Sequence, residues 1–183
     1  MVRIAFFLLA SAAITQLSWR SLRHLRAHGF YRFFAFELLT ALILLNVPTW
    51  FRDPLSARQF ISYFLGIISL ILAIEGFRML RRVGGASSSA ALSTNLPFEN
   101  TSTLVTTGVY RFVRHPLHES LLALAWCAYL KDPFAISSVA LTLGVSGFLL
   151  ATAIVEEREN LVRFGAAYAD YMKRTRRFFP FLF

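Results

Sequence analysis

The side chains most able to do chemistry gather in residues 107–119, immediately before an apolar run. The stretch reads Thr-Gly-Val-Tyr-Arg-Phe-Val-Arg-His-Pro-Leu-His-Glu, and residues 121–130 after it are mostly apolar. Ionisable groups at the mouth of an apolar helix cost free energy to place there, so they are interpreted by default as a functional site. A second charged cluster, residues 156–158 with the sequence Glu-Glu-Arg, follows a later apolar run, and we expect the fold to bring the two clusters together.

Spacing within the first cluster predicts how its ionisable groups share a helix. Arg114 and His118 are four residues apart, as are His115 and Glu119, so each pair lies on one helix face. Pro116 is compatible with a first helical turn, whose unpaired backbone N–H groups can bind an anionic ligand group. Cations on one wall and the carboxylates of the second cluster on the other would suit a zwitterionic ligand with hydroxyl groups. Interfacial ion pairs that hold two helices together are the alternative.

A metal site is the third possibility for these residues. The chain has 4 His in total, too few for a diiron membrane hydroxylase or desaturase built on several His clusters. We therefore predict no metal at the site, although the two clusters hold ligand types for iron or zinc in His115, His118, Glu119, Glu156 and Glu157.

Composition places the chain among multi-pass membrane proteins. Of its 183 residues 56% are hydrophobic and only 16% are charged, whereas a soluble domain of this length would carry about 25% charged residues. The net charge of +9 comes from Arg residues that sit between apolar runs, so lipid phosphates are the expected partners and nucleic acid is not. The single cysteine, Cys127, lies in an apolar run and is expected to be a buried thiol.

The apolar runs predict an all-α protein with about five transmembrane helices. The spans are residues 4–19, 33–50, 60–80, 116–130 and 134–155, and the last two form a C-terminal helical hairpin. The first run is either a cleaved signal peptide or a retained helix, and its apolar extension to Trp19 favours a retained helix. A polar tail follows, in which one helical stripe predicts an interfacial amphipathic helix: Leu161, Phe164, Tyr168 and Met172.

Lys and Arg residues predict the topology of these spans. With the N-terminus outside and five crossings, most of the basic residues fall in the cytoplasmic segments, together with the C-terminus and both charged clusters. The membrane would be a bacterial inner membrane or the endoplasmic reticulum. We divide the chain into three N-terminal helices in residues 1–83, a flexible Gly/Ser/Ala-rich cytoplasmic linker in residues 84–101, and a hairpin with its tail in residues 102–183. The sequence does not indicate an oligomeric state.

Other ionisable residues between the spans have simpler interpretations. His24 and His28 lie in a short basic segment that we expect to be solvated and to face lipid headgroups. Glu75 lies about a turn from Arg78, which predicts an ion pair at the membrane edge. Two residues of the tail, Glu159 and Arg163, are spaced for another pair of the same kind.

The order and spacing of several short motifs resemble a known family. These motifs resemble the isoprenylcysteine carboxyl methyltransferase family and related phospholipid methyltransferases, over roughly residues 104–181. Each motif alone is weak, but the ordered set with a hairpin between is fairly specific. The motifs are Gly108-Val109-Tyr110, Arg114-His115-Pro116-Leu117-His118, Glu156-Glu157-Arg158, the segment from Phe164 to Tyr171, and Arg177-Phe178-Phe179-Pro180.

The resemblance implies an integral-membrane methyltransferase that uses S-adenosylmethionine. An amine or thiol acceptor would have to lose a proton, and His118 or Glu119 could accept it. A membrane reductase that uses NADPH, similar to sterol reductases, and a non-enzymatic membrane protein remain the alternatives. The resemblance assigns residues 102–105, Tyr110, residues 115–118 and Glu156 to the cofactor. The residues that we predict to bind it are Leu104, Val105, Tyr110, Arg114, His115, Pro116, Leu117, His118, Glu156 and Glu157.

Two departures from the family pattern concern the acceptor. His118 stands where the family usually has Tyr, so an aromatic contact persists but becomes titratable near neutral pH. Thr152 stands where prenylcysteine-specific members carry an Arg thought to meet the substrate carboxylate. The expected acceptor is therefore a lipophilic or small molecule other than a prenylcysteine.

Overall fold

A computed structural model describes residues 1–85, 96, 99 and 101–178 of the chain. These residues form helices and no strand, as predicted for the fold class. Short turns of other helix types, η1 (Val47–Thr49), η2 (Leu80–Gly84) and η5 (Gly108–Arg111), extend or precede the main helices. The α-helices are α1 (Val2–Leu22), α2 (His28–Asn46), α3 (Ala57–Met79), α4 (Pro116–Tyr129), α5 (Ile136–Phe164) and α6 (Ala166–Arg174).

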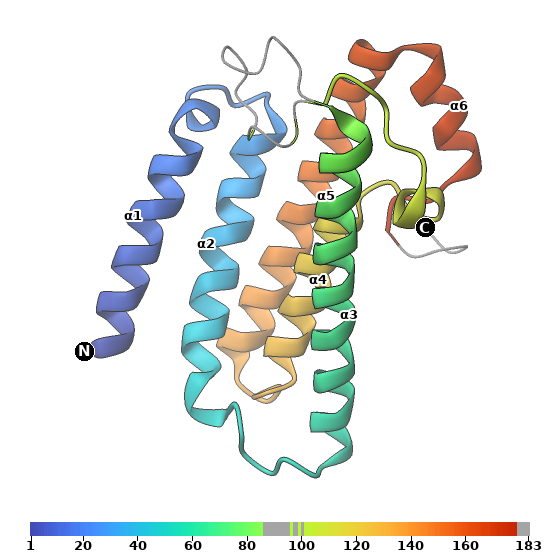
Figure 1. Ribbon diagram of the computed structural model, residues 1–183. Coiled ribbons are helices and arrows are strands. Elements are labelled where there is room, and N and C mark those ends of the chain that lie inside the picture. Colours follow the sequence, from blue (N-terminus) through green and yellow to red (C-terminus); the bar gives the residue numbers. More distant parts are fainter. Residues whose placement is uncertain (86–95, 97–98, 100, 179–183) are drawn as a thin grey trace.

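The first five helices run up and down beside one another, and α6 lies outside the bundle next to the end of α5 (Figure 1). α2 packs against α5 and α1, and α3 packs against α4. The core forms where α2, α4 and α5 meet, around Leu39, Leu42, Val145 and Leu149. Leu39 and Leu42, like Val145 and Leu149, are three or four residues apart, so each pair lies on one helix face.

Small polar side chains tie the helices together inside this bundle. Ser62 of α3 donates to the carbonyl of Cys127 over 2.8 Å, and Ser69 donates to the carbonyl of Ser120 over 2.7 Å. Asn46 of α2 donates to the carbonyl of Ala128 over 2.9 Å. Lipid tails are as apolar as Leu, so packing and such interhelical bonds, rather than the hydrophobic effect, hold helices together in a membrane.

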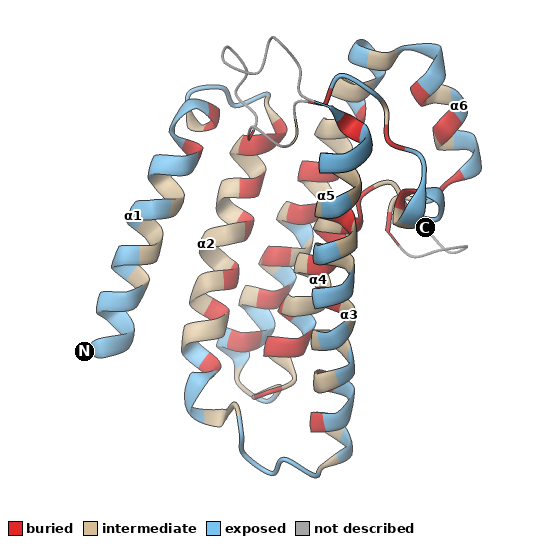
Figure 2. Cartoon of the chain, viewed as in Figure 1, coloured by how far each residue is buried: buried red, intermediate tan, exposed pale blue. Residues whose placement is uncertain are grey.

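Among the residues that the structure describes, four helical segments are long and apolar enough to cross a membrane: Val2–Leu22, His28–Thr49, Ala57–Gly84 and Ile136–Phe164. The prediction of five spans is therefore met only in part. α4 has 14 residues. At about 1.5 Å per residue it is shorter than the hydrocarbon core of about 30 Å. Figure 2 shows exposed residues along the outer faces of α1 and α3, and many of them are large apolar side chains such as Phe6, Phe64 and Ile71, as expected for helices in contact with lipid.

The tail differs from the sequence prediction. α5 continues nine residues beyond the predicted end of the last span, to Phe164, and Gly165 then ends it with a φ of +56°, which a glycine adopts without steric cost. The predicted continuous stripe is therefore split, with Leu161 and Phe164 on α5 and Tyr168 on α6. Tyr168 and Tyr171 are the buried residues of α6.

Two sequence predictions fall at the edge of the described residues. Most of the predicted linker, namely residues 86–95, 97–98 and 100, lies outside them, as do residues 179–183 with the last part of the final motif. Elsewhere, the expected ion pair between Arg78 and Glu75 is present at 3.2 Å, and Cys127 is buried as a free thiol.

Candidate functional site

The first charged cluster is held in place by the chain that follows α6. The backbone N–H of Arg114 donates to the carbonyl of Arg176 over 2.7 Å, and that of His115 donates to the carbonyl of Arg177 over 3.2 Å. Gly108 begins η5 with a φ of +62°, and a Cβ there would lie 2.7 Å from the sulfur of Met79. Both the backbone angle and the close approach of α3 therefore require glycine at this position.

Glu157 anchors this pairing of segments. Its carboxylate accepts a hydrogen bond from Nε of Arg114 over 2.8 Å and another from Nη2 of Arg177 over 2.7 Å. Glu157 is 4% exposed, so two buried or half-buried cations compensate a buried charge. Glu157, which was predicted to bind a cofactor, therefore accepts hydrogen bonds from two Arg side chains, and these contacts hold the first charged cluster in position. Its role in cofactor binding stays a prediction.

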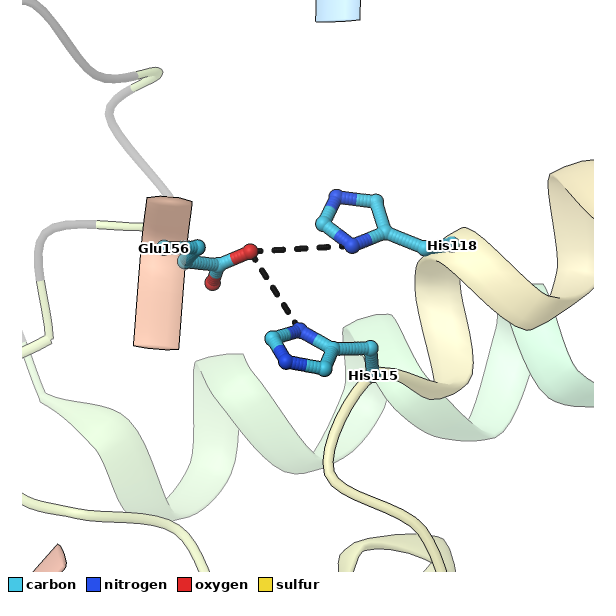
Figure 3. A group of neighbouring side chains, drawn as sticks. All are labelled: His115, His118 and Glu156. Carbon is cyan, nitrogen blue, oxygen red and sulfur yellow. Dashed lines mark ion pairs between the residues drawn. The ribbon is translucent and has the colours of Figure 1, made fainter. Parts of the chain in front are cut away.

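His115, His118 and Glu156 converge from two helices (Figure 3). Oε2 of Glu156 lies 3.4 Å from Nδ1 of His115 and 3.6 Å from Nδ1 of His118. The two imidazole rings stack, with centroids 5.3 Å apart and planes at 19°. Burial alone would lower the pKa of His115, but the carboxylates of Glu156 and Glu157 outweigh it and raise that pKa. The sequence prediction that the hairpin brings these residues together is confirmed.

A cavity of about 490 Å³ opens beside this group. Its size falls in the range of about 300–1,000 Å³ typical of small-molecule sites. Glu119 and Glu157 are not among the lining residues. Most of the residues predicted for the cofactor line it: Leu104, Val105, Tyr110, Arg114, His115, Pro116, Leu117, His118 and Glu156.

Tyr110 adds an aromatic surface to the cavity. It is 7% exposed, and the hydroxyl of Tyr171 donates to its carbonyl over 2.6 Å. Burial raises the pKa of Tyr110 well above its usual range, so its phenol stays neutral. Thr152 is not among the lining residues; it is fully buried, and its hydroxyl donates to the carbonyl of Phe148 over 2.7 Å.

Several lining residues were missed by the sequence analysis. Asn160 lies one helical turn after Glu156 on α5, so the two side chains share a helix face. This spacing was not used because the last span was predicted to end at Val155. Tyr168 and Tyr171 reach the cavity from α6. Arg32 of α2 and Glu99 line it from the other half of the chain, and no local pattern marks either of them.

The expectation of a solvated, lipid-facing His28 is wrong. His28 is 1% exposed, and its Nδ1 lies 2.7 Å from Oε2 of Glu159 while its Nε2 lies 3.3 Å from Oε2 of Glu99. Glu99 also accepts a hydrogen bond from Arg32. Burial alone would raise the pKa of Glu99, but Arg32 and His28 outweigh it and lower that pKa.

This contact also changes the prediction for the tail. Glu159 pairs with His28 rather than with Arg163, and Arg163 instead donates to the backbone carbonyl of Glu99 over 3.5 Å. Glu159 of α5 therefore binds the beginning of α2 through His28 and keeps it next to the cavity. The front and back halves of the chain meet through buried charges.

Four buried side-chain nitrogens among the described residues have no hydrogen-bond partner, and all four belong to residues that line the cavity. They are Nε and Nη2 of Arg32, Nε2 of His115 and Nδ1 of His118. The two imidazole nitrogens lie 3.5 Å from Oε1 of Glu157 and 3.6 Å from Oε2 of Glu156, at ion-pair distance, whereas the two nitrogens of Arg32 form no hydrogen bond with a carboxylate among the described residues. An unpaired buried donor costs about 1–3 kcal/mol, and such groups in native proteins call for an explanation. Their gathering around one cavity indicates a binding site for a polar ligand.

Two kinds of ligand fit the polar groups around the cavity. His115, His118 and Glu156 offer one atom each within 4.8 Å of one another, an arrangement that could hold a metal ion, so the predicted absence of a metal stays a prediction. The wider cavity offers cations, a carboxylate, an aromatic ring and an apolar wall, which suit an organic ligand. Neither a protein-family model, nor a curated protein, nor a solved structure matches the chain.

Proposed function

We propose that the protein is an integral-membrane methyltransferase that uses S-adenosylmethionine and acts on a lipophilic or small acceptor. The observation that carries the proposal is the cavity, which two stretches that resemble the methyltransferase family line together: residues 104, 105, 110 and 114–118 from one stretch and Glu156 from the other. This pairing is what the family resemblance requires, and it joins residues about forty positions apart in sequence.

The residues of the cavity fit the chemical groups of this cofactor. Glu156 could accept hydrogen bonds from ribose hydroxyls or from an ammonium group. The buried ring of Tyr110 and the carboxylate of Glu156 suit a sulfonium cation, because both carry negative potential. When bound, S-adenosylmethionine supplies an electrophilic methyl group.

The protein's own contribution would be to position the reactants and to remove a proton. Methyl transfer depends mainly on holding the acceptor close to the methyl group and aligned with it. For an amine or thiol acceptor, His118 lines the cavity, and its Nδ1 has no hydrogen-bond partner, so it could accept the proton. Burial lowers the pKa of His118 to about 4, so the imidazole is neutral at pH 7 and does not titrate near neutral pH, contrary to the prediction from the sequence. Glu119 does not line the cavity, and we assign it no proton transfer.

The orientation in the membrane belongs to the same proposal. The cavity lies at the beginnings of α2 and α4 and the end of α5. This end of the bundle also holds the ends of α1 and α3 and the tail after α5, and together these segments carry most of the basic residues, so the positive-inside rule favours the cytoplasm for it. A soluble cofactor would then reach the site from the cytoplasm, while an apolar acceptor would reach it through the bilayer.

Binding of labelled S-adenosylmethionine to the purified protein in detergent tests the proposal. We expect saturable binding by the native protein and a loss of about tenfold or more in Glu156→Gln, since one charged hydrogen-bond partner contributes about 1.5–3 kcal/mol. Glu75→Gln is the matched control, because Glu75 pairs with Arg78 on α3 and does not line the cavity. Absence of binding, together with no methyl transfer to a panel of lipids, thiols and amines, would reject the proposal.

A further inference from the structure

Arg32 is a buried cation for which the proposed reaction has no use. It is 2% exposed and lines the cavity from α2. Its Nη1 donates to Glu99 and lies 3.4 Å from Nε2 of His28, whereas its Nε and Nη2 have no partner. Removing two guanidinium nitrogens, with three N–H bonds between them, from water without a hydrogen-bond partner is unfavourable, so a ligand group is the simplest reason for their position.

The two unpaired nitrogens belong to the same edge of the guanidinium. Nε and Nη2 together form the side of the planar fork that binds two oxygens of one carboxylate or phosphate in parallel. Glu99 occupies the Nη1 end and holds the side chain in place. The free edge therefore has the geometry for one bidentate anionic group.

The cavity next to Arg32 continues along an apolar wall. Phe36 lies one helical turn after Arg32 on α2, and Ile74 and Phe77 line the facing side from α3. Ile74 lines the cavity and is also 54% exposed, so the lining reaches the outer surface of the bundle. α2 and α3 hardly contact each other, since α2 packs on α5 and α1 while α3 packs on α4. An apolar chain could therefore extend from the cavity into lipid between α2 and α3.

From these contacts we propose that Arg32 binds the anionic headgroup of an amphiphile, a carboxylate or a phosphate, whose apolar tail lies between α2 and α3. The inference rests on the proposed function, because it names the chemical class of the acceptor. Arg32 would be a specificity residue: it would select an anionic headgroup and set the depth of the acceptor in the cavity, which His118 also lines.

Direct binding to the full-length protein in a nonionic detergent tests the inference without any methyl transfer. The probes are radiolabelled dodecanoate, dodecyl phosphate and dodecanol, which share one tail and differ in the headgroup. We expect the protein to bind at least one of the two anionic probes about tenfold more tightly than dodecanol, and the difference between dodecanoate and dodecyl phosphate identifies the headgroup.

Variants of Arg32 connect this preference to the guanidinium. Arg32→Gln should bind the three probes within about threefold of one another, and Arg32→Lys should keep part of the preference because it keeps the charge but not the fork. Arg78→Gln is the matched control, an exposed arginine of α3 outside the cavity lining. Because Arg32→Gln leaves Glu99 without its cation, the Arg32→Gln/Glu99→Gln double variant provides a second test with no unpaired charge.

The outcomes separate this inference from the proposed function. Equal affinity for the three probes in the native protein, or an anion preference that survives in Arg32→Gln and in the double variant, overturns the inference. A loss of S-adenosylmethionine affinity in Arg32→Gln with an unchanged preference among the probes also overturns it and assigns Arg32 to the cofactor. An anion preference without any binding of S-adenosylmethionine supports the inference and rejects the methyltransferase.

Discussion

Two buried cations lie near opposite ends of the bundle, and each is 2% exposed: Arg32 at the beginning of α2 and Lys131 at the turn between α4 and α5. The ammonium of Lys131 donates to Oε1 of Gln59 over 2.7 Å and lies 4.3 Å from the ring centre of Tyr63 and 5.2 Å from that of Trp50. The guanidinium carbon of Arg32 lies 6.0 Å from the ring centre of Phe36; one end of the guanidinium is paired, and its other edge has no hydrogen-bond partner. Lys131 is therefore a satisfied structural cation, whereas Arg32 is only partly satisfied.

The difference shows that burial by itself does not mark a functional charge. Around Lys131 the neighbouring polar groups are also bonded: Nε2 of Gln59 donates to the carbonyl of Arg52 over 2.8 Å, and Arg58 donates to the carbonyls of Leu130 and Lys131. Around Arg32 the described structure leaves buried nitrogens unpaired next to a cavity. Unpaired groups that share a cavity are the stronger indication of a ligand.

Glu157 gives the largest test of this distinction, because it lies at the cavity end but is fully paired. Glu157→Ala should destabilise the fold by about 3–5 kcal/mol, since it leaves Arg114 and Arg177 without their carboxylate. That corresponds to a decrease in Tm on the order of 10 °C for a chain of this size. Thermal unfolding in detergent measures it, and Glu75→Ala is the exposed control. A Tm within 2 °C of the native value would show that the two ion pairs do not hold the site.

Lys131→Met should have a smaller effect on stability and none on binding. Met keeps the length of the side chain but leaves Oε1 of Gln59 buried without its donor, which costs about 1–3 kcal/mol. We expect a lower Tm and an unchanged affinity for S-adenosylmethionine, measured well below the Tm. A loss of affinity without a loss of stability would contradict the structural role of this end of the bundle.

Acid should weaken the cluster around Arg32 through Glu99. The pKa of Glu99 is lowered from its ordinary value of 4.5, so its contribution to stability is complete above that value and is lost as the pH falls through the folded-state pKa. The charged groups that face it are Arg32 and His28 from α2 and Glu156 from α5. At pH values below about 4.5 the Tm should therefore decrease, and the decrease should be smaller in Glu99→Gln than in the native protein. If the Tm of the native protein and of Glu99→Gln depended equally on pH, Glu99 would not be the group responsible for the loss of stability in acid.

Removal of metal ions should have the smallest effect. His115, His118 and Glu156 could coordinate a cation, but in the methyltransferase proposal they serve the organic ligands. Treatment with EDTA should leave the affinity for S-adenosylmethionine unchanged within error. Lost affinity that returns on addition of Zn²⁺ would instead show that the three residues form a metal centre.

The sequence by itself determined the helices and one wall of the cavity. Runs of apolar residues long enough for a membrane predict helices whatever their neighbours are, and α4 was placed to within one residue at its end. Residues 104, 105, 110 and 114–118 line the cavity together because they are near neighbours in the chain, and one hairpin suffices to add Glu156. The break at Gly165 was missed because the apolar spacing continues across it while the backbone does not.

Only the tertiary structure decided the other wall. His28 and Glu159 are 131 residues apart and Arg32 and Glu99 are 67 apart, so nothing in their local sequence distinguishes them from solvated surface charges. Their burial depends on the packing of α2 against α5, and that packing leaves one edge of Arg32 unpaired beside the cavity. The pattern of residues along a chain fixes which faces are apolar, but whether a charge finds a complete set of partners is a property of the assembled helices.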